Sequence, residues 1–210
     1  MLPRIYLIRH GETEWSLSGQ HTGLTDIPLT AHGENQAQEL GQRLRNISFA
    51  RVFTSPRQRA RRTCELAGFA SVAETDPDLA EWNYGDYEGQ RSADIRGGRP
   101  DWNLFRDGCP NGESPFQISE RADRVIARLR ALEGNIANFS HGHFGRVLAA
   151  RWMGSPVSQA QHFLFSTASI GILGYEHNHA GEPVIALWNA GSSEIFGKRV
   201  SAIEPEVCRW

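Results

Sequence analysis

Arginine, histidine and small residues follow three short apolar segments, at the points where strands of the chain are expected to end. They are Arg9, His10 and Gly11 after residues 5–8, Ser55, Arg57 and Arg59 after residues 51–53, and Ser140, His141, Gly142 and His143 after residues 136–139. Ligands of α/β sheets bind outside the carboxyl ends of parallel strands. Two of the three segments also run into helix starts, whose free N–H groups attract anions. The pattern predicts a binding site for a phosphate group.

Each of these residues also has a structural interpretation. The spacing of His141 and His143 suits a pair of metal ligands, but no Asp, Glu or Cys close in sequence completes an obvious site. For Arg57, Arg61 and Arg62 we favour a solvated helix face. Structural roles are also expected for three further histidines, which are His21, His32 and His162.

The elements that would position the site residues alternate between strand and helix. Short apolar runs predict strands at 5–8, 51–53, 136–139, 170–175 and 184–188. Helix start signals lie at Thr30, Ser55, Ser114 and His141. Ser55 and Ser114 are each followed by proline and then by glutamine at the third position, which predicts a capped helix start. The alternation predicts an α/β fold, a three-layer α/β/α sandwich with a mostly parallel central sheet.

Residues 79–112 interrupt this alternation. The stretch shows no clear period and is too long for a structureless connection, so we interpret it as an insertion that caps the site.

In the helix that follows, Arg121 is expected to face outward. We predict one domain over residues 1–210 with a short C-terminal tail from about 197 to 210.

Composition argues against several classes of protein. The 210 residues are 40 % hydrophobic and 22 % charged, with a formal net charge of −2. This balance predicts a globular chain without broad attraction to nucleic acid or to an anionic membrane surface. We expect neither a membrane span nor a secretory signal. The three cysteines fit neither a disulfide framework nor a zinc ribbon, so a cytoplasmic location is expected.

Six motifs resemble the histidine phosphatase superfamily, the phosphoglycerate mutase-like group, and they occur in the order of that family. They are LIRHGETEW at 7–15, TGLTDIPLTAHG at 22–33, FTSPRQRARRT at 53–63, LAEWNYGDYEG at 79–89, NGES at 111–114 and SHGH at 140–143. The runs EWSLSGQHTGLTD, EWNYGDYEG and WNLFRDGCPNGES are most similar to the sedoheptulose-bisphosphatase-like branch, which removes phosphate from sugar phosphates.

The resemblance implies a role for each matching residue. His10 matches the nucleophile that becomes phosphohistidine, and Glu81 matches the proton donor and acceptor. The residues that hold the transferred phosphoryl group are matched by Arg9, Arg59 and His141. Contacts near the phosphate are matched by Gln20, Thr22 and Gly23, and a position that lines the pocket is matched by His143. Phosphoryl transfer requires mainly positioning and positive charge, so we expect no metal and no other cofactor.

Three departures separate the sequence from the mutases of this family. Ser16 stands where the mutases have asparagine, and Ser92 stands where they have a lysine. The long C-terminal segment of the mutases is also expected to be absent. A mutase must keep its phosphohistidine away from water, whereas a phosphatase need not, so these departures favour a phosphatase.

We therefore predict a metal-independent phosphomonoesterase that acts through phosphohistidine on small sugar phosphates, for example sedoheptulose 1,7-bisphosphate. A cofactor-dependent phosphoglycerate mutase and an inactive phosphate-binding or scaffold protein are the alternatives. The insertion is expected to contribute Trp82, Tyr84 and Arg106 to the pocket, with Arg106 on the far phosphate of a bisphosphate. The expected partner is a small phosphorylated metabolite, not nucleic acid or membrane, and formation of a homo-oligomer is left open.

Overall fold

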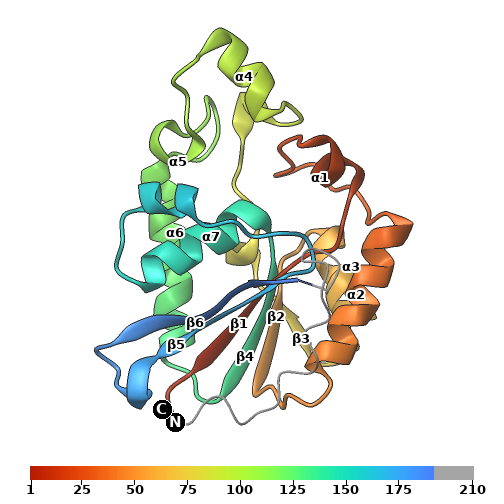
Figure 1. Cartoon of the computed structure of the whole chain (residues 1–210), viewed down its shortest axis with the longest axis vertical. Helices are drawn as coiled ribbons and strands as arrows, with labels where there is room; N and C mark the ends of the chain where they lie inside the picture. The colour runs from red at the N-terminus through yellow and green to blue at the C-terminus, as the bar shows by residue number, and fades with distance from the viewer. Residues whose placement is uncertain (192–210) are drawn as a thin grey trace.

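The computed structural model describes residues 1–191, and the expected tail from about residue 197 lies outside this range. Six strands form one sheet in the order β3-β2-β4-β1-β5-β6 (Figure 1). They are β1 (Arg4–Arg9), β2 (Arg51–Thr54), β3 (Ala73–Thr75), β4 (Asn135–Ser140), β5 (Ile170–Tyr175) and β6 (Pro183–Ala190). The first four strands are parallel, and β5 is antiparallel to both β1 and β6. The predicted mostly parallel sheet is confirmed.

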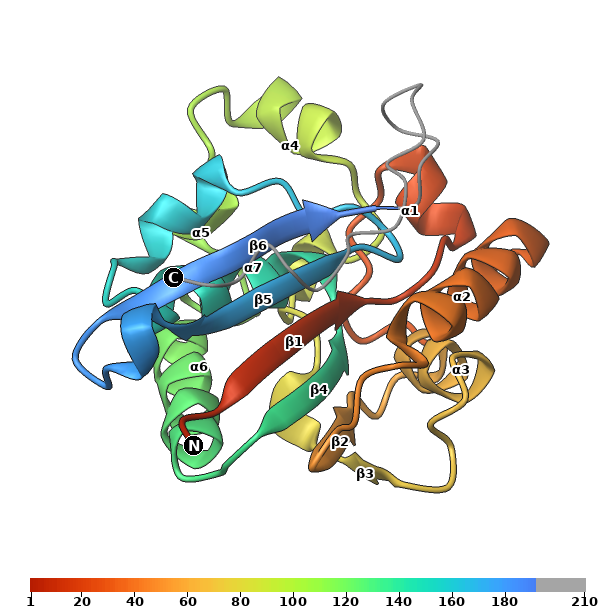
Figure 2. The same cartoon turned by 60° about the horizontal axis from the view of Figure 1, so that its bottom comes forward.

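Helices cover both faces of the sheet (Figure 2). α2 (Ala31–Leu44) and α3 (Gln58–Leu66) lie on one face, and α6 (Pro115–Arg130) and α7 (Gly142–Trp152) lie on the other. Alternate residues of β1 supply the two cores, because side chains alternate across a strand. Tyr6 and Ile8 pack with α2 and α3, whereas Ile5 and Leu7 pack with α6 and α7. This is the predicted three-layer arrangement.

The two predicted serine caps have different outcomes. Ser114 caps α6 as predicted, because its side chain accepts from the Gln117 N–H and the Gln117 side chain accepts from the Ser114 N–H. α3 instead begins at Gln58 without a side-chain cap. The prediction for Ser55 is wrong, because its hydroxyl lies 2.7 Å from Nε2 of His141.

Most of the predicted insertion, residues 79–112, rises above the carboxyl ends of the strands (Figure 1), and we call these residues the cap. η1 (Pro77–Leu79) leads into it, and it contains η2 (Gly85–Tyr87), α4 (Ser92–Gly98) and α5 (Leu104–Asp107). The segment after α1 (Glu14–Ser18) is tied to the cap, because the His21 N–H donates to the Gln90 carbonyl and the Gly89 N–H to the His21 carbonyl, each at 2.9 Å. The remaining short elements are η3 (Val157–His162) and η4 (Glu176–Asn178).

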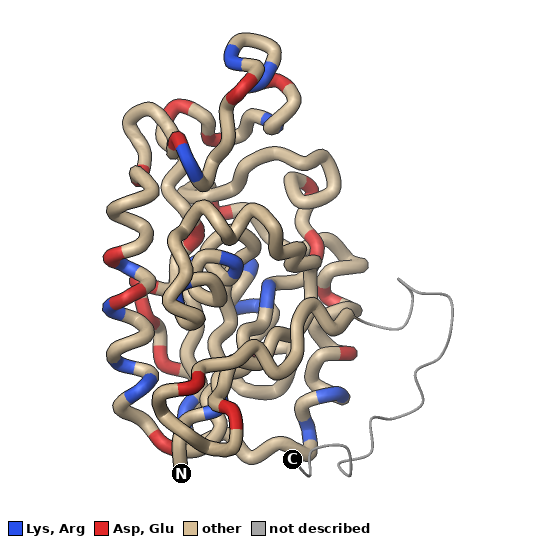
Figure 3. Tube along the Cα trace, turned by 60° about the vertical axis from the view of Figure 1, so that its left-hand side comes forward, with Lys and Arg blue, Asp and Glu red and all other residues tan. Residues whose placement is uncertain are grey.

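Charged residues of both signs are interspersed along the described trace (Figure 3). On α6 they form exposed ion pairs such as Arg128 with Asp76 at 2.6 Å. No helix within residues 1–191 combines the length and the apolar character that a membrane span requires.

Candidate active site

His10 follows β1 and is held in one hydrogen-bonding state. Its Nδ1 lies 2.7 Å from the carbonyl oxygen of Gly11. A carbonyl only accepts hydrogen bonds, so Nδ1 carries the proton and Nε2 keeps its lone pair. Burial, followed by the charges of Arg59 and Arg9, holds the pKa of His10 well below its ordinary value. His10 is therefore a neutral imidazole at pH 7, with Nε2 free to act as a nucleophile.

Arg59 lies in the first turn of α3, and its side chain is fully buried. Its Nη1 donates to the carbonyl of Thr25 at 3.0 Å, and its Nη2 donates to the carbonyls of Thr22 at 2.8 Å and Gly23 at 3.2 Å. A Cβ at Gly23 would lie 2.5 Å from the carbonyl oxygen of Trp82, so glycine lets the segment 22–25 lie against the cap. The carbonyls of this segment orient the Arg59 guanidinium without neutralising its charge.

Arg9, at the end of β1, is held against the start of α7. Its Nη1 donates to the carbonyl of Phe165 at 2.5 Å. A Cβ at Gly142 would lie 3.1 Å from Cζ of Arg9, a contact that leaves little room for any side chain. Burial lowers the pKa of Arg9, which nevertheless keeps its positive charge at pH 7.

His141 precedes α7 and faces His10, with 5.3 Å between the two ring centroids. Its Nε2 lies 2.7 Å from the hydroxyl of Ser55, which has no other acceptor for its proton among the described residues. Ser55 therefore donates to Nε2, and His141 carries its own proton on Nδ1. Burial, followed by the charges of Arg59, His10 and Arg9, holds the pKa of His141 well below its ordinary value.

Three buried nitrogens of these residues have no hydrogen-bond partner within residues 1–191. They are Arg9 Nε, Arg59 Nε and His141 Nδ1. A buried donor without a partner is costly and needs an explanation. An anion between them, next to His10, would supply the missing acceptors and meet two guanidinium charges. Phosphate has this charge and enough oxygens for all three donors.

Glu81, at the start of the cap, lies at the N-terminus of α7. Its carboxylate accepts from the backbone N–H groups of Trp82 at 2.9 Å, His143 at 3.0 Å and Phe144 at 2.8 Å. The carboxylate therefore accepts from two of the first N–H groups of the helix, a position that favours negative charge. A carboxyl group fixed beside the proposed phosphate is placed to exchange a proton with the reacting oxygens.

Arg121 reaches Glu81 from α6 and was not predicted to do so. Its guanidinium forms an ion pair with Glu113 at 2.8 Å and donates to the carbonyls of Asp78 and Ala80. A longer bond of 3.3 Å reaches the carbonyl of Glu81 itself. The outward orientation expected for Arg121 is wrong, because its side chain is 10 % exposed. Arg121 fixes the backbone that carries Glu81.

The residues that were expected to contact the substrate have different contacts in the structure. Gln20 donates to the Gly89 carbonyl at 2.9 Å, and Thr22 and Gly23 use their carbonyls to hold Arg59. Trp82 is 0 % exposed and donates to the Glu113 carbonyl, so it belongs to the core and not to the pocket wall.

Arg106 also differs from expectation. Its guanidinium is 59 % exposed and pairs with Asp107 at 2.9 Å, so it is not directed at the other site residues. The guanidinium of Arg146, on α7, instead lies 4.5 Å from the centroid of the Phe105 ring, which is 5.4 Å from the ring of His143. Arg146 donates to the carbonyls of Ala160 at 3.0 Å and Gln161 at 2.9 Å, and burial lowers its pKa to about 10.

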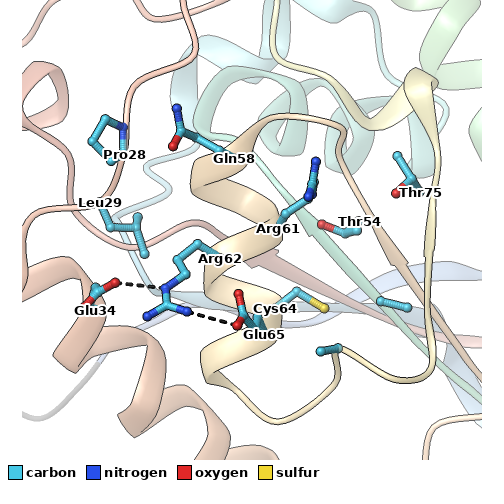
Figure 4. A pocket seen from close by; sticks show the side chains of 12 residues that line it. Pro28, Leu29, Glu34, Thr54, Gln58, Arg61, Arg62, Cys64, Glu65 and Thr75 are labelled. Atoms are coloured by element: carbon cyan, nitrogen blue, oxygen red, sulfur yellow. Dashed lines mark hydrogen bonds and ion pairs between the residues drawn. The ribbon is translucent and has the colours of Figure 1, made fainter.

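A pocket of about 600 Å³ lies beside α3 and the edge strand β3, and none of the predicted site residues lines it (Figure 4). Arg62 lies at this pocket and forms ion pairs with Glu34 at 2.9 Å and Glu65 at 3.0 Å. This placement agrees with the structural interpretation of Arg62. The pocket is separate from the cluster around His10.

Comparisons with known proteins agree with this geometry. Residues 5–191 match the model of the histidine phosphatase superfamily, branch 1. An acid phosphatase of Mycobacterium tuberculosis is 44 % identical over 83 % of this chain and 87 % of its own length. The sedoheptulose 1,7-bisphosphatase of Saccharomyces cerevisiae is 37 % identical over 89 % of this chain and 93 % of its own.

A solved structure of a Mycobacterium tuberculosis open reading frame superposes with a TM-score of 0.84 and 41 % identity, over 90 % of this chain and 97 % of that one. The sheet and the helices on both its faces are thus those of a known family. The chain belongs to branch 1 of the histidine phosphatase superfamily and is a phosphatase.

Proposed function

We propose that the chain hydrolyses small sugar phosphates through a phosphohistidine at His10. The observation that carries the proposal is the set of three unpartnered buried nitrogens around a neutral His10. Phosphoryl transfer depends chiefly on positioning and on positive charge near the equatorial oxygens. Arg9 and Arg59 supply the positive charge, and N–H groups of Arg9, Arg59 and His141 are placed to position the phosphoryl group.

In the first step, Nε2 of His10 attacks phosphorus and the bond from phosphorus to the ester oxygen breaks. The Nδ1 proton stays on the ring, and the Gly11 carbonyl stabilises the positive charge that the ring acquires. Glu81 gives its proton to the departing alkoxide, which then leaves as an alcohol.

In the second step, water attacks the phosphohistidine and the bond from phosphorus to nitrogen breaks. Glu81, now a carboxylate, takes a proton from the water. His10 returns to the neutral state from which it started, and inorganic phosphate leaves. One carboxyl group therefore serves as acid and then as base.

The sugar phosphate class is supported by the relative named sedoheptulose 1,7-bisphosphatase. A second phosphate on the substrate would meet Arg146 and not Arg106, because Arg146 lies over Phe105, which packs against His143, whereas Arg106 is exposed and pairs with Asp107. A bidentate arginine contact to phosphate is a strong, charge-assisted interaction.

The experiment is a panel of phosphorylated metabolites and p-nitrophenyl phosphate, with release of inorganic phosphate as the readout. The proposal predicts release from all active substrates and faster release from sugar phosphates. Isomerisation of phosphoglycerate without phosphate release would show a mutase instead. Phosphate binding without any turnover would show the inactive binding protein.

A further inference from the structure

Tyr84 of the cap and His143 of α7 form a short hydrogen bond beside the proposed site. The Tyr84 hydroxyl lies 2.6 Å from Nδ1 of His143. The tyrosine side chain is 1 % exposed, so its hydroxyl cannot rely on bulk water. Burial, with the charge of Glu81 nearby, holds the pKa of Tyr84 well above its ordinary value. Tyr84 is therefore a protonated phenol over the whole physiological range of pH.

The direction of this bond follows from what else each group can reach. The Tyr84 hydroxyl has no other acceptor within the described part of the chain. If His143 donated instead, a buried O–H would be left without a partner, which is energetically costly. Tyr84 therefore donates, and Nδ1 of His143 accepts.

This direction fixes the tautomer of His143. Burial, followed by the charges of Arg146, His21 and Arg9, holds the pKa of His143 well below its ordinary value, so the ring is neutral at pH 7. A neutral imidazole that accepts at Nδ1 carries its proton on Nε2. His143 is thus the opposite tautomer to His10, whose proton is on Nδ1.

The position of the His143 ring relates this donor to the reaction. The backbone N–H of His143 donates to the Glu81 carboxylate at 3.0 Å, so the two residues are adjacent. Aromatic rings pack around the His143 ring, with Phe105 at 5.4 Å, His21 at 5.7 Å and Tyr84 at 5.8 Å between centroids. The only hydrogen bond of the His143 ring within residues 1–191 is the one at Nδ1, so Nε2 has no partner there. An unpartnered donor is therefore left on a residue whose backbone binds the Glu81 carboxylate.

We propose that His143 is a specificity-determining residue that donates from Nε2 to a hydroxyl of the leaving group next to the ester oxygen. Tyr84 is its positioning residue, because it sets the tautomer in which Nε2 is a donor. His21 supports Tyr84 by packing against its ring at 4.6 Å and 31°. The substrate class selected in this way is a phosphate ester of a polyol, as opposed to a plain alkyl or aryl phosphate. This inference rests on the proposed phosphatase function and adds a selection rule to it.

The first test measures the tautomer directly and does not depend on turnover. The ring nitrogens of the full chain, labelled with nitrogen-15, are observed by NMR, and the His143 signals are identified by their loss in His143→Gln. We expect a protonated Nε2 and an unprotonated Nδ1 in the wild type, and a mixture of tautomers in Tyr84→Phe. A wild-type His143 protonated on Nδ1 would overturn the inference.

The second test compares glycerol 1-phosphate with propyl phosphate, two esters that differ only in the hydroxyls of the leaving group. The wild type should favour the hydroxylated ester in kcat/KM. Tyr84→Phe and His143→Phe should each reduce this preference about fivefold, equivalent to a neutral hydrogen bond of about 1 kcal/mol. Tyr87→Phe is the matched control, because it removes another cap hydroxyl, one bonded to Arg99 and not to His143.

The outcomes separate the two proposals. An unchanged preference in both Tyr84→Phe and His143→Phe, with turnover retained, overturns the role of His143 and leaves the phosphatase function standing. A wild type that hydrolyses neither these esters nor p-nitrophenyl phosphate overturns the proposed function and the selection rule with it. His143→Phe, which has no nitrogen to donate, keeps the second test decisive if Tyr84→Phe fails to fold.

Discussion

Replacing Arg121 with leucine should destabilise the protein far more than removing a neighbouring arginine from the same helix. Arg121 and its partner Glu113 are 10 % and 20 % exposed, and the guanidinium also binds the carbonyls of Asp78 and Ala80. Leucine would leave the half-buried Glu113 carboxylate with only the Asn83 N–H as a donor and would remove the donor from these carbonyls. Breaking one side of a buried ion pair costs about 3–5 kcal/mol. For a chain of this length, the loss corresponds to a fall in Tm of roughly 6–20 °C.

Arg128→Ala provides the matched control. Arg128 also lies on α6 and pairs with Asp76 and Asp78, but it is 49 % exposed. Exposed pairs contribute about 0–1 kcal/mol because water screens them. The assay is urea unfolding followed by tryptophan fluorescence, with the free energy of unfolding taken for both variants and the wild type.

A double-mutant cycle with Glu113→Gln isolates the pair from the other contacts of Arg121. The double variant should be less destabilised than the sum of the single variants, because the uncompensated carboxylate is then absent. If Arg121→Leu costs no more than Arg128→Ala, the buried network does not hold the Glu81 backbone and the reasoning fails.

Three further predictions concern the chemistry and the charge states of the site. Glu81→Gln should slow phosphorylation of His10 by sugar phosphates about 10²–10⁴-fold and by p-nitrophenyl phosphate much less, because p-nitrophenolate leaves without a proton; equal losses in single-turnover kinetics would remove Glu81 from the acid role. Activity should survive exhaustive chelation, since Arg9 and Arg59 supply the positive charge; inactivation by EDTA that one divalent ion reverses would contradict this. Burial lowers the pKa of His21 from 6.5 to about 4, so the unfolded chain binds this proton first as the pH falls. The stability that the neutral His21 contributes above pH 6.5 is therefore lost as the pH falls from 6.5 to 4, and the loss is about 3 kcal/mol. Over that window, the free energy of urea unfolding should depend less on pH in His21→Gln than in the wild type.

The sequence predicts those parts of the site that depend on strand ends. Arg9, His10 and His141 come together because β1 and β4 are parallel neighbours, with Arg9 opposite Ser140 in the register. The order of apolar runs and helix starts was sufficient to predict the layers. β3 was missed because its three residues, Ala73–Thr75, carry no apolar run and are mostly exposed.

Side-chain partners from distant segments could not be predicted in the same way. Ser55 has the local pattern of a helix cap, but a histidine 86 positions away takes its hydroxyl. Trp82 and Arg106 both lie in the cap, and only tertiary packing decides that one is buried and the other pairs with its neighbour Asp107. For Arg121 a local signal did exist, because it follows Ile118 by three positions and so shares the inward face of α6.

The most direct test of the account is whether His10 carries the phosphoryl group during turnover. The wild type is mixed with p-nitrophenyl phosphate, quenched in alkali within the first turnover, and analysed by mass spectrometry of the intact chain and of its peptides. We expect one phosphoryl group, stable in base and lost in acid, on Nε2 of His10. His10→Ala should fold, carry no label and release no phosphate. A label on another residue, or a fully active His10→Ala protein, would contradict the account.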